Sequence, residues 1–170
     1  LAAVARTAGD TLGVESVTGP GYALIDHLDG KSGAVAAVKR GGWDVVVLQQ
    51  GPSTLAVNRD SLVLWTAMFD SIIRPTGART ALYMVWPAGA SAQGTDAVRQ
   101  SYQLAAQSVG AVPVPLYQDA ASTEFVFPIV NAEVAFAIVE DPEQVDKPLE
   151  IRPHCPGLAH TSLADPRGPR

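Results

Sequence analysis

The sequence predicts an α/β protein built around a parallel sheet. Two continuous apolar runs carry this prediction, Asp44–Leu48 and Thr80–Trp86. Neither run alternates with polar residues, which is typical of parallel strands buried on both faces. Residues 60–73 and 95–109 place apolar side chains at helical spacing. Strand, helix, strand and helix in this order indicate βαβ units, so we expect a three-layer α/β/α fold with helices on both faces of the sheet.

Further elements are expected around this centre. Residues 1–9 are Ala-rich and are typical of the end of a helix. Val14–Thr18 alternates as a short strand, which Gly19–Pro20–Gly21 ends. Ser32–Arg40 predicts a helix that stops at a glycine pair, and Val112–Val114 predicts a last short strand.

The last third of the chain departs from this pattern. Residues 117–170 hold seven of the 13 prolines. Phe125–Val139 is apolar enough for one or two strands, and from Glu140 onward we expect little regular structure. The sequence therefore divides into an α/β domain over residues 1–116 and a divergent Pro-rich segment over 117–170, partly disordered.

Composition excludes several classes of function. The 170 residues are 47% apolar and 17% charged, which is enough to form a buried core. The net charge is -5 and the largest basic cluster is the pair Lys39–Arg40, so no nucleic-acid partner is expected. No apolar run is long enough for a membrane span. Cys155 is the single cysteine, so we expect no intramolecular disulfide. The sequence has no CxxC motif and no His/Cys ligand cluster, and we expect no metal or other cofactor.

The localisation stays open. The chain begins at Leu1 and not at a methionine, so we expect its natural start to lie upstream. The oligomeric state is equally open.

Three loops follow the expected strands. In open parallel sheets, ligands bind beyond the carboxyl ends of the strands. The loops at 19–22, 49–54 and 87–93 are rich in Gly, Pro and Ser, so their backbone N–H groups can approach a ligand closely. The same residue types also simply turn the chain, and both interpretations remain open for each loop.

Two segments resemble conserved blocks of the SGNH (GDSL-type) hydrolases. The segment WDVVVLQQGPS at 43–53 resembles the third block, in which a buried strand ends in Gly-x-Asn or a Gln-containing variant. The segment GPGYALIDHL at 19–28 resembles the second block, in which a glycine follows the second strand. The spacing between them suits one helix, and the resemblance extends over about residues 1–115.

The resemblance implies an incomplete flavodoxin-like SGNH architecture and hydrolysis of a small carboxyl ester or acetyl ester. In that family a serine attacks the ester, a histidine acts as base, and backbone and amide donors form the oxyanion hole. By this resemblance Gly21 supplies the backbone donor. Ser53 stands at the family's Asn position if Gly51 matches the family glycine, and Gln50 is the alternative donor in the Gln-type variant.

The catalytic blocks of the family are missing from this sequence. No Gly-Asp-Ser, Gly-Asn-Ser or Asp-x-x-His occurs, and the nucleophile block is expected upstream of Leu1. His27 is expected at the rim of the site or in a structural role, while His154 and His160 lie in the Pro-rich tail and are not expected to be catalytic. The resemblance therefore predicts that this chain is inactive by itself.

Two other functions remain as alternatives. The first is a non-catalytic module that binds a small ligand or carbohydrate in the same crevice. The second is a flavodoxin-like domain, which is the weaker alternative because the loops lack a Ser/Thr-rich phosphate cradle.

Overall fold

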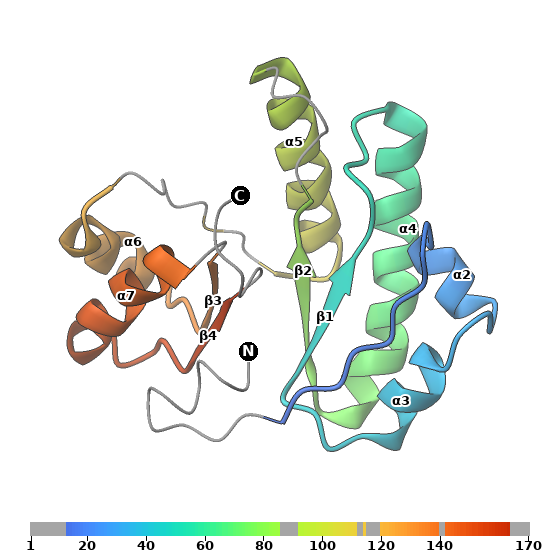
Figure 1. Cartoon of the computed structure of the whole chain (residues 1–170), viewed down its shortest axis with the longest axis horizontal. Coiled ribbons are helices and arrows are strands. Elements are labelled where there is room, and N and C mark those ends of the chain that lie inside the picture. Colours follow the sequence, from blue (N-terminus) through green and yellow to red (C-terminus); the bar gives the residue numbers. More distant parts are fainter. Residues whose placement is uncertain (1–12, 86–91, 112–113, 115–119, 140–141, 164–170) are drawn as a thin grey trace. The chain divides into compact units, whose positions relative to one another are not determined.

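The computed structural model describes residues 13–85, 92–111, 114, 120–139 and 142–163. The chain divides into two compact units, Ser16–Pro113 and Leu1–Glu15 with Val114–Arg170. Each unit holds a two-stranded parallel sheet and a separate apolar core (Figure 1). The mixed α/β class expected from the sequence is confirmed at this level. The expected helix at 1–9 and most of the expected strand at 112–114 lie outside the described residues.

The unit Ser16–Pro113 is built on one βαβ motif. Its elements in chain order are α2 (Leu24–Leu28), α3 (Ala34–Arg40), β1 (Val45–Gln49), α4 (Ala56–Ile73), the 3-10 turn η1 (Arg74–Thr76), β2 (Arg79–Tyr83) and α5 (Ala92–Ser108). β1 and β2 are parallel, with Val47 opposite Ala81. The two strands and three of the helices occur within a few residues of their expected positions, while α2 was not expected.

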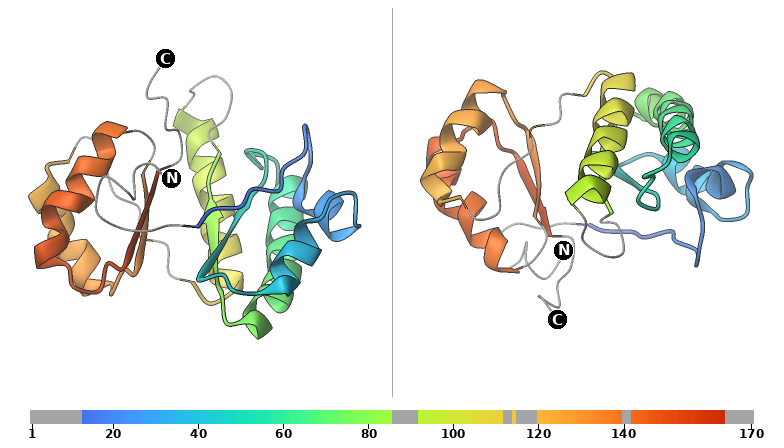
Figure 2. Two further views of the ribbon diagram at one scale, coloured as in Figure 1. Left: turned by 60° about the horizontal axis from the view of Figure 1, so that its bottom comes forward. Right: turned by 90° about the horizontal axis from the view of Figure 1, so that it is seen from above.

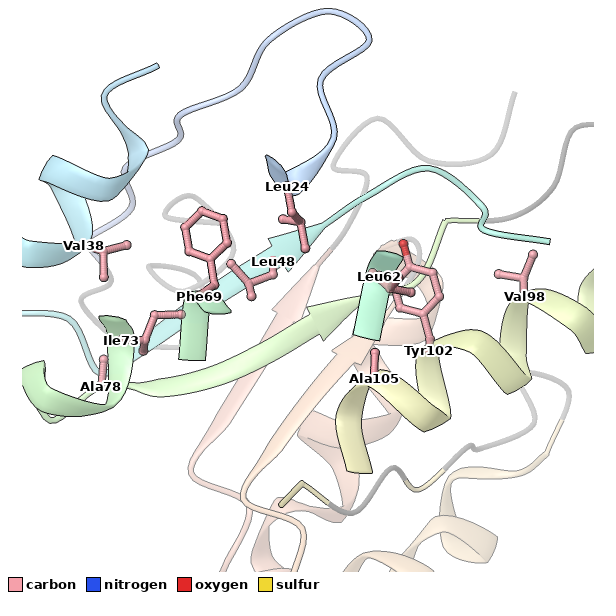
Figure 3. Packing of buried hydrophobic residues seen from close by; sticks show 10 residues of the cluster. All are labelled: Leu24, Val38, Leu48, Leu62, Phe69, Ile73, Ala78, Val98, Tyr102 and Ala105. Carbon is pink, nitrogen blue, oxygen red and sulfur yellow. The ribbon is translucent and has the colours of Figure 1, made fainter. Parts of the chain in front are cut away.

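A single layer of helices covers one face of this sheet. Val46 and Leu48 of β1 and Leu82 of β2 belong to the apolar core of the unit. The helices contribute to the same core, which is shown in Figure 3: Leu24 from α2, Val38 from α3, Leu62, Phe69 and Ile73 from α4, and Val98, Tyr102 and Ala105 from α5. Alternate strand residues point toward this layer because side chains in a strand alternate between faces.

The opposite face of β1 is open, which corrects one expectation. Val47 is 46% exposed and Gln49 is also exposed, so the strand is not buried on both faces. In the described residues α2 to α5 all contribute to the one core, and no second layer of helices is seen on the other face. A continuous apolar run does not indicate which face of the strand the helices will cover. In β1 the helices pack against Val46 and Leu48, while Val47 and Gln49 are exposed.

The segment before α2 is not a strand. Residues 14–18 form no ladder with either strand, contrary to the sequence-based expectation. β1 therefore has β2 as its single partner among the described residues. A short alternating segment needs a neighbouring strand to become one, and this segment has none.

The second unit holds another βαβ motif. Its elements are the 3-10 turn η2 (Ser122–Phe125), α6 (Val126–Asn131), β3 (Phe136–Val139), α7 (Pro142–Ile151), the 3-10 turn η3 (Arg152–His154) and β4 (His160–Leu163). β3 and β4 pair in parallel, with α7 between them in sequence (Figure 2). Its core consists of Phe125, Ile129, Ile151, Cys155 and Leu158.

Two expectations for this unit differ from the structure. The apolar segment Phe125–Val139 begins as a helix, and only its last four residues form a strand. Pro128 fits this helix because it lies in the first turn, where the missing N–H has no intrahelical partner to lose. The expectation of little regular structure after Glu140 is wrong for residues 142–163, where Ile151, Cys155 and Leu158 are buried and hold α7 against the core.

Val46 and Val47 lie on opposite faces of β1, so the same substitution should reduce stability by different amounts at the two positions. Val46→Asp should cost at least about 2 kcal/mol of stability, because the carboxylate would enter the helix-covered core. Val47→Asp should cost about 1 kcal/mol or less, because Val47 already faces solvent. Urea unfolding of the two variants checks this, and equal losses would show that β1 is buried on both faces.

Candidate functional site

Gln50 is a buried polar residue that joins three elements at the carboxyl end of β1. The Leu24 backbone N–H donates a hydrogen bond to the Gln50 side-chain Oε1 at 3.1 Å. Its backbone carbonyl accepts a hydrogen bond of 2.5 Å from the Tyr102 hydroxyl. Gln50 is 8% exposed. The first turn of α2, the end of β1 and the middle of α5 are therefore held together through this one residue.

The orientation of the Gln50 amide follows from its partner. A backbone N–H can only donate, so the amide oxygen must face Leu24, and the amide nitrogen faces the other way. Within the described residues this nitrogen donates no hydrogen bond to another protein atom. The side chain therefore presents an unused N–H donor beside the end of β1, next to the segment that follows Gly21.

Gly21 lies in the turn that leads into α2. Its φ of 72° is in the left-handed region, which glycine adopts without the steric cost that a side chain would bring. The turn is closed by the Tyr22 N–H, which donates to the Gly19 carbonyl at 3.1 Å. Gly21 is exposed, and its own N–H has no acceptor in the part of the chain that the structure describes.

Ser53 is held inside its own loop. The residue is 5% exposed and has a φ of 57°, which is uncommon for a residue with a side chain. Its hydroxyl donates to the Gly51 carbonyl at 3.0 Å, and its carbonyl accepts from the Ser101 hydroxyl at 2.7 Å. Both groups are used in fixing the loop after β1 against α5.

Tyr102 and Ser101 are site residues that the sequence interpretation did not assign. The helical stripe at 95–109 places Tyr102 in the core, and the structure confirms its burial. A buried tyrosine hydroxyl needs a hydrogen-bond acceptor, so the predicted burial of Tyr102 could have indicated a polar contact in the core. Burial raises the pKa of Tyr102 to about 12, because the protein interior disfavours the charged phenolate.

His27 forms a hydrogen-bonded pair with Ser32. The distance from Nδ1 to the Ser32 Oγ is 2.6 Å, and the Tyr22 ring meets the imidazole edge-on at 5.4 Å between centroids. The Ser32 Oγ also accepts the Ala34 N–H at 3.2 Å. No carboxylate hydrogen-bonds to His27 in the described part of the chain. The pair ties the end of α2 to the start of α3.

The other expected site segments are elsewhere. His154 ends η3 and His160 begins β4, so both belong to the second unit. Residues 86–91, which include most of the third candidate loop, lie outside the described residues. A shallow hollow of about 470 Å³ lies at the amino ends of β1 and β2, at the opposite end of the sheet from Gln50, and is lined by Lys39, Gly41, Ser71, Ile72, Pro75 and Thr76.

The described residues contain no cluster of three or more His, Cys, Asp or Glu side chains placed to hold a metal ion. None of their helices is both long and apolar enough to cross a membrane.

Comparison with known proteins gives no relative. The chain matches no family model, no curated protein and no solved structure. The arguments for function therefore rest on the geometry around Gln50.

Tyr102→Phe should reveal the contact between α5 and the Gln50 carbonyl. Loss of the hydroxyl should cost about 1 kcal/mol at neutral pH, because the buried carbonyl loses its donor. The raised pKa adds a pH signature. Between pH 10 and 12 the unfolded tyrosine ionises first, so the wild type loses up to about 2–3 kcal/mol across this window.

The variant lacks that titration, so its deficit should shrink or reverse as pH rises. Denaturant unfolding at pH 8 and pH 11.5 measures the difference. A deficit that stays constant with pH would show that Tyr102 is not the buried group.

Proposed function

We propose that this chain is the central part of an SGNH-type ester hydrolase that acts on a carboxyl ester or acetyl ester. The observation that carries the proposal is the hydrogen bond from the Leu24 N–H to the Gln50 side chain. It brings together the two segments that resemble the second and third blocks of that family. Leu24 and Gln50 are 26 residues apart in the sequence, so their contact is a property of the fold and not of local spacing.

Two unused donors support an oxyanion-binding role. The Gly21 N–H and the Gln50 amide nitrogen both lack acceptors among the described residues, and Leu24, which bonds to Gln50, is three residues from Gly21. Donors aimed at a developing oxyanion are each worth about 3–4 kcal/mol in acyl transfer. Ser53 suits this role less well, because its hydroxyl already donates to Gly51. The Gln-type variant of the third block is therefore the one we propose.

The proposed architecture is the three-layer sheet of that family, with this chain supplying part of it. β1 would correspond to the third strand, and its open edge is consistent with a missing neighbour. The missing strand would carry the nucleophilic serine. The pair of Ser32 and His27 does not replace the catalytic pair, because His27 has no orienting carboxylate in the described residues and Ser32 is engaged by a backbone N–H.

The second candidate is a binding module on the same fold. The favouring observation is that the described residues around Gln50 offer fixed donors, and none of these residues is an activated nucleophile. Such a site would hold the carbonyl or hydroxyl groups of a small ligand or carbohydrate without reacting with them. The sequence immediately upstream of Leu1 separates the two functions: a strand ending in Gly-Asp-Ser or Gly-Asn-Ser supports the hydrolase, and its absence supports the binding module.

The purified chain should not hydrolyse p-nitrophenyl acetate in a serine-dependent way. Among the described residues no serine beside the Gln50 amide is activated by a base, so phenylmethylsulfonyl fluoride should leave the background rate unchanged. Release of nitrophenolate followed at 405 nm is the measurement. A rate that the inhibitor abolishes would overturn the assignment of the nucleophile to a missing segment.

In a longer chain that contains the upstream segment, Gln50→Leu should lower kcat by about 10²–10³-fold, as for loss of one oxyanion donor. Leu55→Ala is the matched control, because Leu55 lies a few residues further along, just before α4, is 63% exposed and should stay close to wild type. Equal losses in the two variants would indicate a damaged loop, and no loss in Gln50→Leu would exclude the proposed donor.

A further inference from the structure

The turn that contains Gly21 also holds the Tyr22 ring against Gly19. Residues 19–22 form a four-residue turn, which the Tyr22 N–H closes by donating to the Gly19 carbonyl at 3.1 Å. Proline in the second position and a glycine of positive φ in the third are typical of a type II turn. The turn leads into α2 (Figure 1). The bond that closes it does not use the Gly21 N–H, so the turn itself does not satisfy this donor.

Gly19 leaves the space in which the Tyr22 ring packs. A Cβ atom at Gly19 would lie 2.5 Å from Cδ2 and 2.6 Å from Cγ of that ring, which is closer than real Cβ atoms come to such neighbours. Gly19 does not have the positive φ of Gly21, so its backbone conformation does not itself require glycine. The absence of a side chain at Gly19 is therefore needed for the packing of Tyr22.

His27 holds the Tyr22 ring in this position. The imidazole meets the ring edge-on at 5.4 Å between centroids, which is a favoured arrangement of two aromatic rings. His27 is itself buried, and its Nδ1 lies 2.6 Å from the Ser32 Oγ. The same Oγ accepts the Ala34 N–H at the start of α3. A ring displaced from Gly19 would therefore also have to change its contact with a histidine that is fixed from the other side.

We propose that Tyr22 is the positioning residue for the Gly21 N–H. Its packing fixes the turn to α2, and the Leu24 N–H of α2 is bonded to the Gln50 side chain. The Gly21 N–H thus keeps one direction relative to the Gln50 amide. A donor stabilises an oxyanion best when it is held in place before the charge develops. The role of this donor rests on the proposed hydrolase function, while its orientation by Tyr22 is a separate property of the fold.

Four variants of this chain separate positioning from general stabilisation. Tyr22→Leu removes the ring, and Gly19→Ala displaces it by adding a methyl group in its place. Tyr22→Phe keeps the ring and is the conservative rescue, because the Tyr22 hydroxyl makes no hydrogen bond in the described residues. Gly13→Ala is the matched control for Gly19→Ala, since Gly13 is exposed and a Cβ there would meet nothing within 4 Å.

The direction and mobility of the Gly21 N–H are measured by NMR on ¹⁵N-labelled protein. Residual dipolar couplings report the direction of the N–H bond relative to the amides of α4, and ¹⁵N relaxation reports its order parameter. We expect an order parameter of about 0.85 in wild type, Tyr22→Phe and Gly13→Ala, and below about 0.6 with a changed coupling in Tyr22→Leu and Gly19→Ala. In a longer chain that contains the upstream segment, Tyr22→Leu should lower kcat by about 10²-fold with KM unchanged, and Tyr22→Phe should restore it.

Two results would overturn the proposal. An unchanged Gly21 coupling and order parameter in Tyr22→Leu and Gly19→Ala would show that the turn keeps its direction without the ring. Altered couplings throughout α4 in both variants would show that Tyr22 stabilises the whole unit and does not specifically orient this donor. If Tyr22→Leu alone fails to fold, Gly19→Ala decides between these outcomes. A longer wild-type chain without esterase activity would contradict the hydrolase function, and the NMR result would still decide the role of Tyr22.

Discussion

The structure of the unit Ser16–Pro113 depends on Gln50, a polar residue that must be satisfied where it is buried. Gln50 lies where β1 ends and the core begins, and an amide placed there costs free energy unless its groups are hydrogen-bonded. The Leu24 N–H satisfies its side chain and the Tyr102 hydroxyl satisfies its carbonyl. These two bonds join elements that lie 26 and 52 residues away in the sequence, and in the described residues the Gln50 amide nitrogen donates no hydrogen bond to the protein.

The small sheet explains why such cross-connections matter. Two strands of five residues have little stability by themselves, and in the described part of the unit the helices α2 to α5 all pack on one of their faces. Stability must come from helix packing and from contacts that fix the helices to the strand ends. Because the described sheet has only two strands, β1 has one unpaired edge, and Val47 is exposed. The candidate site thus lies at the end of a sheet that has two strands in this unit.

The sequence predicted the elements of the βαβ motif better than their surroundings. Uninterrupted valines identified β1, and the spacing of Leu62, Phe69 and Ile73 identified α4. Burial of Val47 was mispredicted because covering helices are not encoded in the strand itself. For the site, Gln50 and Ser53 were both candidates from resemblance, and only the direction of their hydrogen bonds distinguishes them. The role of Tyr102 required knowing which carbonyl lies opposite a helix 52 residues away.

The most direct measurement is hydrogen exchange in Gln50→Ala, followed by mass spectrometry over residues 22–29 and 62–73. Without the side-chain oxygen, the Leu24 N–H loses its acceptor. A helix of five residues such as α2 is not stable without such tertiary contacts. We expect faster exchange over 22–29 and unchanged protection in α4, whose core contacts do not involve Gln50. Unchanged exchange over 22–29 would show that Gln50 does not hold α2 to the end of β1, and the candidate site would lose its basis.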